Sequence, residues 1–352
     1  MAAKAAASGV LFRPHFKTHQ SAEIGSWFRA QGVSAITVSS LDMAWYFHEQ
    51  GWQDITLAMV INPALIPDLE RLAGLVKLGL LADSAEILTR LGRELKNPLR
   101  VWLKLDTGYR RTGLDAADQS GLKQAAQTLK TFPHLEPAGI LNHCGQAYRC
   151  ADRRAIMQLY RENTARLNQV RLFLEELLQR KLLLSVGDTP SCNTLEDFAP
   201  ADEIRPGNFV FNDLMQLASG SCAEADLALA VACPLIGKYP QRAEIVLHGG
   251  AVHLSREFTR NPDGSPRFGL ATRLSEQGWG PLNNAASIHS LSQEHAVAYA
   301  DPDFARTLAR GEAMAVIPVH ACLAVAAVNY YHCLQNGDFP AMNAPVRAGR
   351  GF

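Results

Sequence analysis

The sequence predicts an α/β protein that combines an N-terminal (β/α)8 TIM barrel with a C-terminal, mostly β domain. Over about the first 200 residues, eight short apolar runs alternate with longer amphipathic stretches. Near-continuous apolar runs are typical of parallel strands that helices cover on both faces, and eight strand–helix units make a closed barrel. After about residue 213 the pattern changes to short β-prone segments separated by Gly, Pro and Asn clusters. We therefore expect a barrel over residues 1–213 and a β-rich domain over residues 214–352.

The barrel strands and helices can be assigned one by one along the chain. The strands are predicted at 10–16, 34–40, 54–59, 78–83, 99–106, 138–143, 182–187 and 202–206. The helices between them are predicted, for example, at 41–50, 64–75, 85–95, 116–131 and 152–180. An open, doubly wound sheet is the alternative arrangement, but the sequence lacks the Gly-x-Gly-x-x-Gly turn that would support it.

The second domain is predicted from shorter segments. Its strands are expected at 227–236, 243–248, 251–258, 286–292 and 313–323. Turn-forming clusters such as Asn-Pro-Asp-Gly-Ser-Pro-Arg at 261–267 separate them, which favours a mostly β structure.

The composition narrows the class of partner. The 34 basic and 34 acidic residues give a formal net charge of +0, and 47% of the residues are hydrophobic. Without a basic stripe, nucleic acid and anionic membranes are poor partners, and no apolar run approaches the roughly 18 residues of a membrane span. The seven scattered cysteines lack CxxC spacing, which favours free thiols in a reducing cytoplasm. Residues 1–9 lack a long apolar core, so a signal peptide is not predicted.

The segment Val10–Gln20 (Val-Leu-Phe-Arg-Pro-His-Phe-Lys-Thr-His-Gln) places a lysine at the end of the first strand. Stability gives little reason for it, because an ammonium group resists burial. Arg13, His15 and His19 flank Lys17, and neighbouring positive charge favours a neutral amine that can attack a carbonyl. A solvated basic loop is the simpler interpretation of a lone lysine.

Two glycine-containing turns follow the last two strands, where barrels commonly bind phosphate. They are Ser185–Ser191 (Ser-Val-Gly-Asp-Thr-Pro-Ser) and Arg205–Phe209 (Arg-Pro-Gly-Asn-Phe). Glycine lets the backbone approach an anion closely, and hydroxyl and amide groups can donate hydrogen bonds to it. Most such turns only reverse the chain, so both interpretations stay open at this point. The candidate phosphate residues are Gly187, Thr189, Ser191, Gly207 and Asn208.

Polar residues also follow the fifth and sixth strands. The fifth ends in Lys104–Gly113 (Lys-Leu-Asp-Thr-Gly-Tyr-Arg-Arg-Thr-Gly), where Asp106 would in the simplest case cap a tight turn. The sixth ends in Asn142–Tyr148 (Asn-His-Cys-Gly-Gln-Ala-Tyr). His143 there is either a satisfied core histidine or a group of the active site.

A candidate metal pair lies near the C-terminus, in His320-Ala321-Cys322. On an extended strand the two side chains would point to the same side and meet one ion, whereas on a helix this spacing would diverge. The residues that follow Cys322 (Leu-Ala-Val-Ala-Ala-Val) are compatible with a helix. Two protein ligands cannot close a structural zinc site but suit an open site that water and substrate complete.

Taken together, these motifs resemble the D-threonine aldolase and D-serine dehydratase family, which comprises alanine racemase-like enzymes of fold type III. Arg-Pro-His-Phe-Lys-Thr-His matches the family's Arg-Pro-His-x-Lys-Thr-His segment, whose lysine forms a Schiff base with pyridoxal 5'-phosphate (PLP). The resemblance therefore implies that Lys17 carries PLP. It extends from about residue 10 to residue 330 with five motifs in the family's order, and it points to the metal-dependent D-serine dehydratase branch.

The resemblance also implies roles around PLP. In the Asp-Thr-Gly-x-x-Arg-x-Gly turn, Arg111 would reach the ring hydroxyl, whereas Arg110 would point elsewhere. In the His-x-Gly-x-x-Tyr stretch, His143 would lie beside the ring and Tyr148 near the pyridine nitrogen, which would stay unprotonated. The segments Ser-x-Gly-x-Thr-Pro and Arg-Pro-Gly-x-Tyr/Phe bind the phosphate in the family, which implies Gly187, Thr189, Gly207 and Asn208.

The family's metal pair is Pro-x-His-x-Cys/Asp, which His320 and Cys322 match with zinc as the expected ion. The cysteine version is associated with dehydratases and the aspartate version with aldolases. Ser290–His295 resembles the family's Ser-x-Glu-His segment, so His295 is a further site candidate. Two features depart from the family. Gln20 stands where lysine is usual, and the chain starts sixteen residues before Lys17, without a further strand and helix expected to support cofactor retention.

The implied activity is that of a D-serine or related 3-hydroxy-D-amino acid dehydratase. Lys17 would remove the α-proton, PLP would delocalise the carbanion, and zinc would make the β-hydroxyl a better leaving group, giving a 2-oxo acid and ammonia. A D-threonine aldolase, with His143 or a metal hydroxide as base for the β-hydroxyl, is the second interpretation. A racemase would need a second base and no metal, and a non-catalytic PLP carrier would need neither the metal pair nor the second domain. The family analogy also implies a homodimer.

Overall fold

The computed structural model describes residues 1–335 and 337–342, which form two compact units. The first unit comprises Met1–Lys17 and Ala22–Gly207, and the second comprises Thr18–Ser21 and the described residues from Asn208 onward. The short segment directly after Lys17 therefore belongs to the second unit. Of the predicted second domain, residues 336 and 343–352 lie outside the described residues.

The first unit is a parallel barrel, and the predicted eight strands are present. Their order is β1-β9-β8-β7-β5-β4-β3-β2, and a short extra strand, β6, pairs with β5. The barrel closes where His15 bridges Thr37 and the N–H of Phe16 donates to the carbonyl of Thr37 at 2.8 Å. Regular pairing of β1 is shorter than predicted because Pro14 has no N–H to donate. The strands are β1 (Leu11–Phe12), β2 (Ala35–Val38), β3 (Asp54–Val60), β4 (Lys77–Ala82), β5 (Leu99–Asp106), β6 (Leu114–Asp115), β7 (Leu135–Leu141), β8 (Leu183–Val186) and β9 (Glu203–Ile204).

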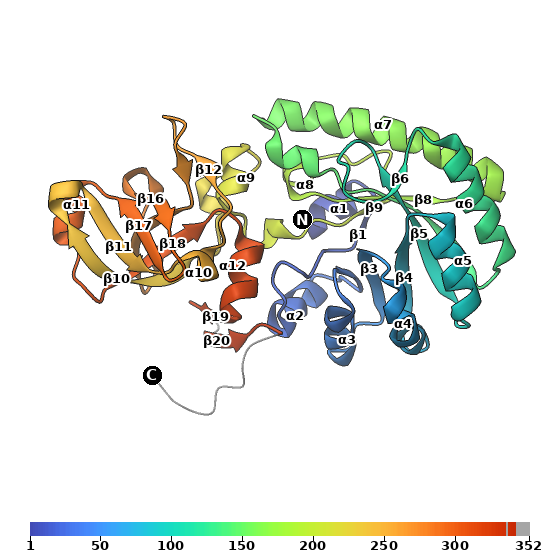
Figure 1. Cartoon of the computed structure of the whole chain (residues 1–352), viewed down its shortest axis with the longest axis horizontal. Helices are drawn as coiled ribbons and strands as arrows, with labels where there is room; N and C mark the ends of the chain where they lie inside the picture. Colours follow the sequence, from blue (N-terminus) through green and yellow to red (C-terminus); the bar gives the residue numbers. More distant parts are fainter. Residues whose placement is uncertain (336, 343–352) are drawn as a thin grey trace. The chain divides into compact units, whose positions relative to one another are not determined.

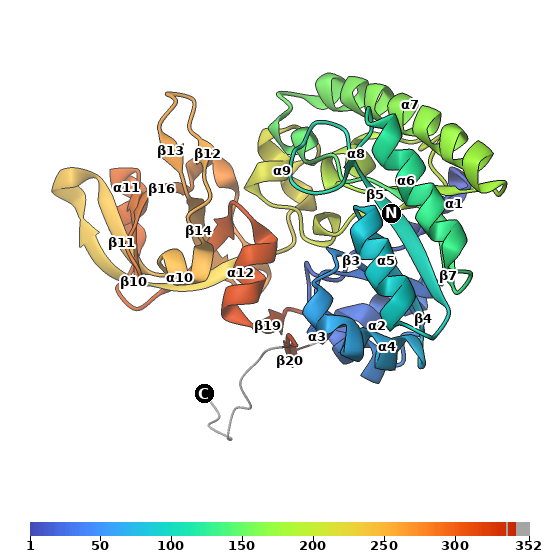
Figure 2. The same ribbon diagram turned by 45° about the vertical axis from the view of Figure 1, so that its right-hand side comes forward.

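Helices connect these strands and run along the outside of the sheet (Figures 1 and 2). Several begin at a residue whose side chain accepts a backbone N–H of the first turn, as Ser40 does from Met43 (3.1 Å) and Asp152 from Ala155 (2.8 Å). No described helix is long and apolar enough to cross a bilayer. The helices are α1 (Ala2–Ala7), α2 (Ala22–Ala30), α3 (Leu41–Glu49), α4 (Ile66–Ala73), α5 (Ala85–Glu94), α6 (Gln119–Thr131), α7 (Arg153–Leu178) and α8 (Thr189–Thr194).

A buried charge network ties the first strands of the barrel to the last. Glu203 accepts hydrogen bonds from Nε of Arg13 and from Oγ of Ser185, both at 2.6 Å. Arg205 donates from Nε to the same Ser185 hydroxyl at 2.7 Å. Glu203 is fully buried, and Arg13 and Arg205 are nearly so. One carboxylate therefore offsets the positive charge of two guanidinium groups that are buried away from water.

Replacing Glu203 by glutamine should lower the free energy of unfolding by about 3–5 kcal/mol, because the buried guanidinium groups of Arg13 and Arg205 lose a shared carboxylate while the side-chain volume is kept. Urea unfolding of the two proteins measures the difference. Glu162→Gln, on the surface of α7, removes the same charge and should change stability by less than about 0.5 kcal/mol. A Glu203→Gln value as small as that of the control would contradict this account.

The second unit contains a seven-stranded antiparallel sheet of order β15-β14-β16-β17-β11-β10-β18. Because β14 also pairs with β18, six of these strands form a closed ring around an apolar core that includes Leu235, Ile245, Leu247 and Val316. Its strands are β10 (Val231–Tyr239), β11 (Glu244–His248), β12 (Thr259–Arg260), β13 (Pro266–Arg267), β14 (Gly269–Ser275), β15 (Gly278–Trp279), β16 (Ala286–Leu291), β17 (His295–Tyr299), β18 (Ala313–Pro318), β19 (Tyr330–Cys333) and β20 (Gly337–Pro340). Its helices are α9 (Leu214–Ala218), α10 (Ala251–Leu254), α11 (Pro302–Thr307) and α12 (Ala321–Val328).

Three predictions for this unit need correction. The segment 251–258 begins as helix α10 rather than a strand, because the N–H groups of Ala251 and Val252 bond to the loop carbonyls of Ser292 and Gln293 (2.8 and 3.3 Å). The segment 313–323 is a strand only to Pro318, after which α12 begins. Strands β14, β15 and β17 of the sheet and the short strand pairs β12–β13 and β19–β20 were not predicted.

Candidate active site

Lys17 lies where the barrel closes, directly after the buried Phe16. The ring of Phe16 packs against Phe28, Phe47 and Trp52 at centroid distances of 5.2, 4.8 and 5.1 Å. This aromatic cluster anchors the lysine segment to the barrel. The Lys17 side chain itself is exposed, so its amine is accessible to a carbonyl compound.

The positive charge expected around Lys17 is largely absent. Arg13 is buried in the barrel, where it forms ion pairs with Glu203 at 2.6 Å and with Asp54 at 2.5 Å. Burial lowers the pKa of His19 to about 3, so this ring is neutral at physiological pH. The prediction that Arg13 and His19 crowd the lysine with positive charge is therefore wrong, because one charge is neutralised by carboxylates and the other is not formed.

Acid should destabilise the protein through His19. An unfolded chain protonates this histidine near pH 6.5, whereas the folded chain keeps it neutral down to about pH 3. Its contribution to stability is therefore complete above pH 6.5 and is lost progressively as the pH falls toward 3. At about pH 5 the loss amounts to about 2 kcal/mol. The free energy of unfolding, measured at neutral pH and at about pH 5, tests this. Replacing His19 by glutamine should make the loss of stability between the two pH values smaller by this amount, whereas the same change at the exposed His295 should leave the loss unchanged.

The turn after β5 is organised by Asp106. Its carboxylate accepts hydrogen bonds from the N–H groups of Gly108 and Arg110, each at 2.9 Å, so it caps the turn. Gly113 has a φ of +122°, and a Cβ at this position would lie 2.9 Å from the carbonyl oxygen of Lys104. Only glycine suits this position, which explains the spacing of the motif.

Arg111 is exposed, and its charge acts on buried groups at the end of the barrel. Its guanidinium carbon lies 5.2 Å from the ring centroid of Tyr109. Burial, together with the charges of Arg205 and Arg111, lowers the pKa of Lys104 to about 8. Arg111 also contributes to the lowered pKa of His143. The predicted ring-hydroxyl ligand therefore lies in the same electrostatic neighbourhood as the other predicted barrel residues.

His143 is a neutral ring with a fixed orientation. Its Nδ1 lies 2.8 Å from the carbonyl oxygen of Gly187, and because a carbonyl only accepts, Nδ1 carries the hydrogen and Nε2 keeps its lone pair. Burial is the main cause that lowers the pKa of His143 to about 3, and the charges of Lys17 and Arg111 add to it. Its ring centroid lies 6.2 Å from that of Tyr148. Lys17, Arg111, His143 and Tyr148 are thus gathered at one end of the barrel.

The turn after β8 places a free hydroxyl beside this group. The backbone N–H of Thr189 donates to the phenol oxygen of Tyr148 at 3.3 Å, and Oγ1 of the buried Thr189 has no hydrogen-bond partner among the described residues. A Cβ at Gly187 would lie 2.9 Å from the backbone of Arg205, so only glycine allows this close approach. Ser191 is buried, and its N–H donates to Asp188 at 2.8 Å.

The second phosphate turn crosses the division between the units. Gly207 ends the first unit, and Asn208 begins the next part of the second. The side-chain amide of Asn208 donates to Asp213 at 2.5 Å, which commits one of its two hydrogens, while its Oδ1 has no partner among the described residues.

The barrel residues together suit a phosphorylated aromatic aldehyde such as PLP. They provide an exposed lysine (Lys17), an arginine (Arg111), a neutral histidine (His143) and a buried hydroxyl without a hydrogen-bond partner among the described residues (Thr189).

The predicted metal ligands stand at the beginning of α12. His320 precedes the helix, and Cys322 lies in its first turn. The extended geometry considered for the pair is absent, yet the side chains still meet. Although burial opposes the charge, hydrogen bonds with Cys322 and Glu257 raise the pKa of His320 to about 10. An imidazole nitrogen and a sulfur from one short segment are donors that zinc prefers.

Three contacts within the second unit support this pair, and no sequence motif indicates any of them. Oε2 of Glu257 lies 2.7 Å from Nδ1 of His320. The thiol of Cys322 donates to Oγ1 of Thr18, the residue after Lys17, at 3.3 Å. The buried Asp213 accepts the N–H of Ala321 at 3.0 Å and so fixes the backbone between the two ligands. Each contact joins segments far apart in the sequence, so no local pattern indicates it.

The described residues contain no group of three or more His, Cys, Asp or Glu side chains placed to hold a metal ion. The pair is therefore compatible with an open site of two protein ligands. His295, the remaining candidate, begins β17, is exposed and pairs in register with His248 of β11.

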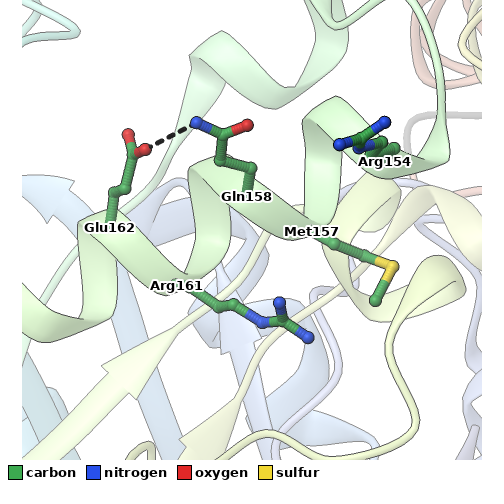
Figure 3. Close-up of a pocket in the computed structure, with 5 residues that line it drawn as sticks. All are labelled: Arg154, Met157, Gln158, Arg161 and Glu162. Carbon is green, nitrogen blue, oxygen red and sulfur yellow. Dashed lines mark hydrogen bonds between the residues drawn. The ribbon is translucent and has the colours of Figure 1, made fainter.

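A surface hollow of about 350 Å³ lies elsewhere on the first unit, along α7 (Figure 3). One helix supplies all its lining residues, and Gln158 donates to Glu162 at 2.9 Å within it. It contains none of the predicted site residues and no lysine, histidine or cysteine, so it is not the candidate site.

The barrel and its motifs match a known family. Residues 1–214, more than half of the chain, match the family described as "Alanine racemase, N-terminal domain". The chain belongs to this family. Residues 228–334 match a second family, described as "Putative serine dehydratase domain". The resemblance identified from the motifs is confirmed, as is the predicted combination of a barrel with a β-rich domain.

Individual relatives of this family cover nearly the whole chain. The D-threo-3-hydroxyaspartate dehydratase of Delftia sp. (strain HT23) is 28% identical over 93% of this chain and 88% of its own. The D-serine dehydratase of Dictyostelium discoideum is 28% identical over 95% of this chain and 89% of its own. These relatives are dehydratases, which confirms the predicted enzyme class, a lyase.

The solved structures give the same fold. That of the Delftia enzyme aligns with a TM-score of 0.83 over 94% of this chain and 88% of its own. A cysteine-to-alanine mutant of a D-threo-3-hydroxyaspartate dehydratase, solved in the metal-free form, aligns with a TM-score of 0.84 at 28% identity, over 96% of this chain and 91% of its own. D-threonine aldolase from Filomicrobium marinum aligns with a TM-score of 0.78 at 17% identity, over 94% of this chain and 86% of its own, a likeness in fold.

Proposed function

We propose that this protein is a PLP- and metal-dependent dehydratase of 3-hydroxy-D-amino acids such as D-serine. Elimination of water across Cα–Cβ would give an enamine, which hydrolyses to a 2-oxo acid and ammonia. The observation that carries the proposal is the meeting of His320 and Cys322 at the start of α12, since a racemase or a PLP carrier needs no such pair. The dehydratases among the relatives, one of them solved as a metal-free cysteine mutant, support it.

In this proposal the barrel holds PLP. Lys17 would bind the aldehyde, Arg111 would contact the ring hydroxyl and Tyr148 would lie near the pyridine nitrogen. Bound PLP would supply an electron sink for the pair of electrons left at Cα. The phosphate would be held by the residues of the two turns, Gly187, Thr189, Gly207 and Asn208.

The protein's own groups would then move the protons. The Nζ of Lys17 would serve as the base that takes the proton from Cα of the substrate. His143 stays neutral and would pack beside the cofactor ring. His320 and Cys322 would hold a divalent ion, with zinc suggested by their N and S donors, and this ion would make the β-hydroxyl a better leaving group.

An aldolase is the second candidate, favoured by one observation. The Nε2 lone pair of His143 is available because its Nδ1 is committed to Gly187, so this ring can accept the proton of a β-hydroxyl group. Cleavage of Cα–Cβ would then release glycine and an aldehyde.

Product analysis on D-threonine, with PLP and zinc added, separates the two candidates by mass spectrometry. The dehydratase should give 2-oxobutanoate and ammonia. Glycine and acetaldehyde would overturn the dehydratase assignment in favour of the aldolase. Neither product, from protein that carries PLP, would contradict both and favour a carrier.

We further propose a cytoplasmic homodimer. All seven cysteines are free thiols, which suits a reducing compartment. The dimer follows from the family resemblance, and the molar mass in solution tests it.

A further inference from the structure

We propose that Glu257 is a positioning residue for the metal pair. Its carboxylate would hold the His320 ring in one orientation and one tautomer, with Nε2 left for the ion. This inference rests on the proposed function, since it concerns the same pair, but it assigns a role to a residue that no sequence motif indicates.

The hydrogen bond fixes the tautomer. Oε2 of Glu257 lies 2.7 Å from Nδ1 of His320. An ionised carboxylate can only accept, so Nδ1 must carry a hydrogen. When an ion displaces the second ring proton, the lone pair that it meets is on Nε2. Histidines that bind metal ions commonly donate their other ring N–H to a carboxylate, which orients the ring and makes the ligand nitrogen more basic.

Stability does not account for this contact. The side chains of His320 and Glu257 are 28% and 46% exposed, and ion pairs that water reaches to this extent add little to the stability of a fold. The contact nevertheless joins two segments 63 residues apart, just before β12 and just before α12. A function at His320 explains why a carboxylate is held there.

Glu257 is better placed to orient His320 than to bind the ion itself. Its oxygen contacts Nδ1, which lies on a different edge of the imidazole from Nε2. The described residues contain no three-residue group suited to a metal ion, so Glu257, His320 and Cys322 do not converge as three ligands. The Glu257 carboxylate therefore acts through the ring.

Cobalt(II) binding to the full-length protein tests the proposal without any measurement of turnover. Cobalt bound to a cysteine sulfur has a charge-transfer absorbance in the near ultraviolet, so titration gives both affinity and ligand identity. Glu257→Gln should weaken cobalt binding by about 10–100-fold while the charge-transfer band keeps its position, because the ligands stay the same. Glu257→Asp, which retains a carboxylate, should recover part of the lost affinity.

Glu276→Gln is the matched control, because it removes the same charge from an exposed turn of the same unit and should leave the affinity unchanged. Wild-type affinity in Glu257→Gln would overturn the proposal. A changed ligand-field spectrum in that variant would also overturn it, since Glu257 would then be a ligand. If wild-type protein gives no charge-transfer band, or the band survives Cys322→Ala, the proposed metal pair fails first and the inference fails with it.

Discussion

Replacing Lys17 by alanine should give a folded protein that carries no covalently attached PLP and turns over D-amino acids at least about 10²–10⁴-fold more slowly. Two functions would be lost together, namely the attachment of the cofactor and the base that takes the Cα proton. The fold should be unaffected, because the Lys17 side chain is exposed and the segment is anchored by Phe16. The visible absorbance of lysine-bound PLP and the rate of 2-oxo acid formation measure the two effects.

Lys104 is the amine that competes for this role. Its pKa is lowered to about 8, mainly by burial, which favours the neutral and nucleophilic form. It is only 6% exposed, however, and its Nζ donates to the carbonyl of Leu105 at 2.9 Å. Borohydride reduction followed by peptide mapping should therefore place PLP on Lys17. Modification of Lys104 instead would contradict the assignment, and Lys96→Ala, on an exposed loop, serves as the control for loss of a lysine.

The barrel and most of its candidate residues could be predicted because their signals are local. A parallel strand appears as a short apolar run, and a barrel enzyme has its polar residues directly after such runs. Lys17 and Arg111 follow predicted strands and His143 ends one, so the order of strands alone brings them to one end of the barrel. The position of Thr189 follows from the same rule.

Contacts between distant segments could not be predicted in this way. Arg13 lies in the lysine motif, but its charge is neutralised by Glu203 and Asp54, which belong to other strands and show no pairing signal in the sequence. Glu257 and Thr18 meet the metal pair only because the second unit folds around it.

The metal pair at His320 and Cys322 differs from its predicted extended geometry for another reason. The run after Pro318 favours a helix, and Asp213 accepts its first N–H group, so the pair is presented by a helix terminus rather than by a strand. The prediction of two facing side chains was made for the wrong secondary structure. The side chains still meet because one of them precedes the helix and retains extended backbone angles.

Replacing Cys322 by alanine should remove the metal ion and slow elimination by roughly 10³-fold, while PLP stays bound. The sulfur is one of only two proposed protein ligands, so His320 alone should hold the ion too weakly to survive dialysis. Loss of the ion removes several kcal/mol of stabilisation from the departing hydroxyl group. Metal content, the absorbance of bound PLP and the rate of 2-oxobutanoate formation from D-threonine measure the three parts of this expectation.

Two further variants separate the metal effect from a loss of thiol or of structure. Cys333→Ala removes a thiol from β19 of the same unit and should retain both metal and activity. Cys322→Asp replaces the sulfur by a carboxylate, the version of the motif associated with aldolases, and should retain the ion while glycine rises relative to 2-oxobutanoate among the products.

If Cys322→Ala keeps its metal and its rate, the ion is bound elsewhere and the departing hydroxyl group needs another acid. A product ratio unchanged in Cys322→Asp would instead mean that the barrel residues, and not the metal ligand, decide which bond is broken.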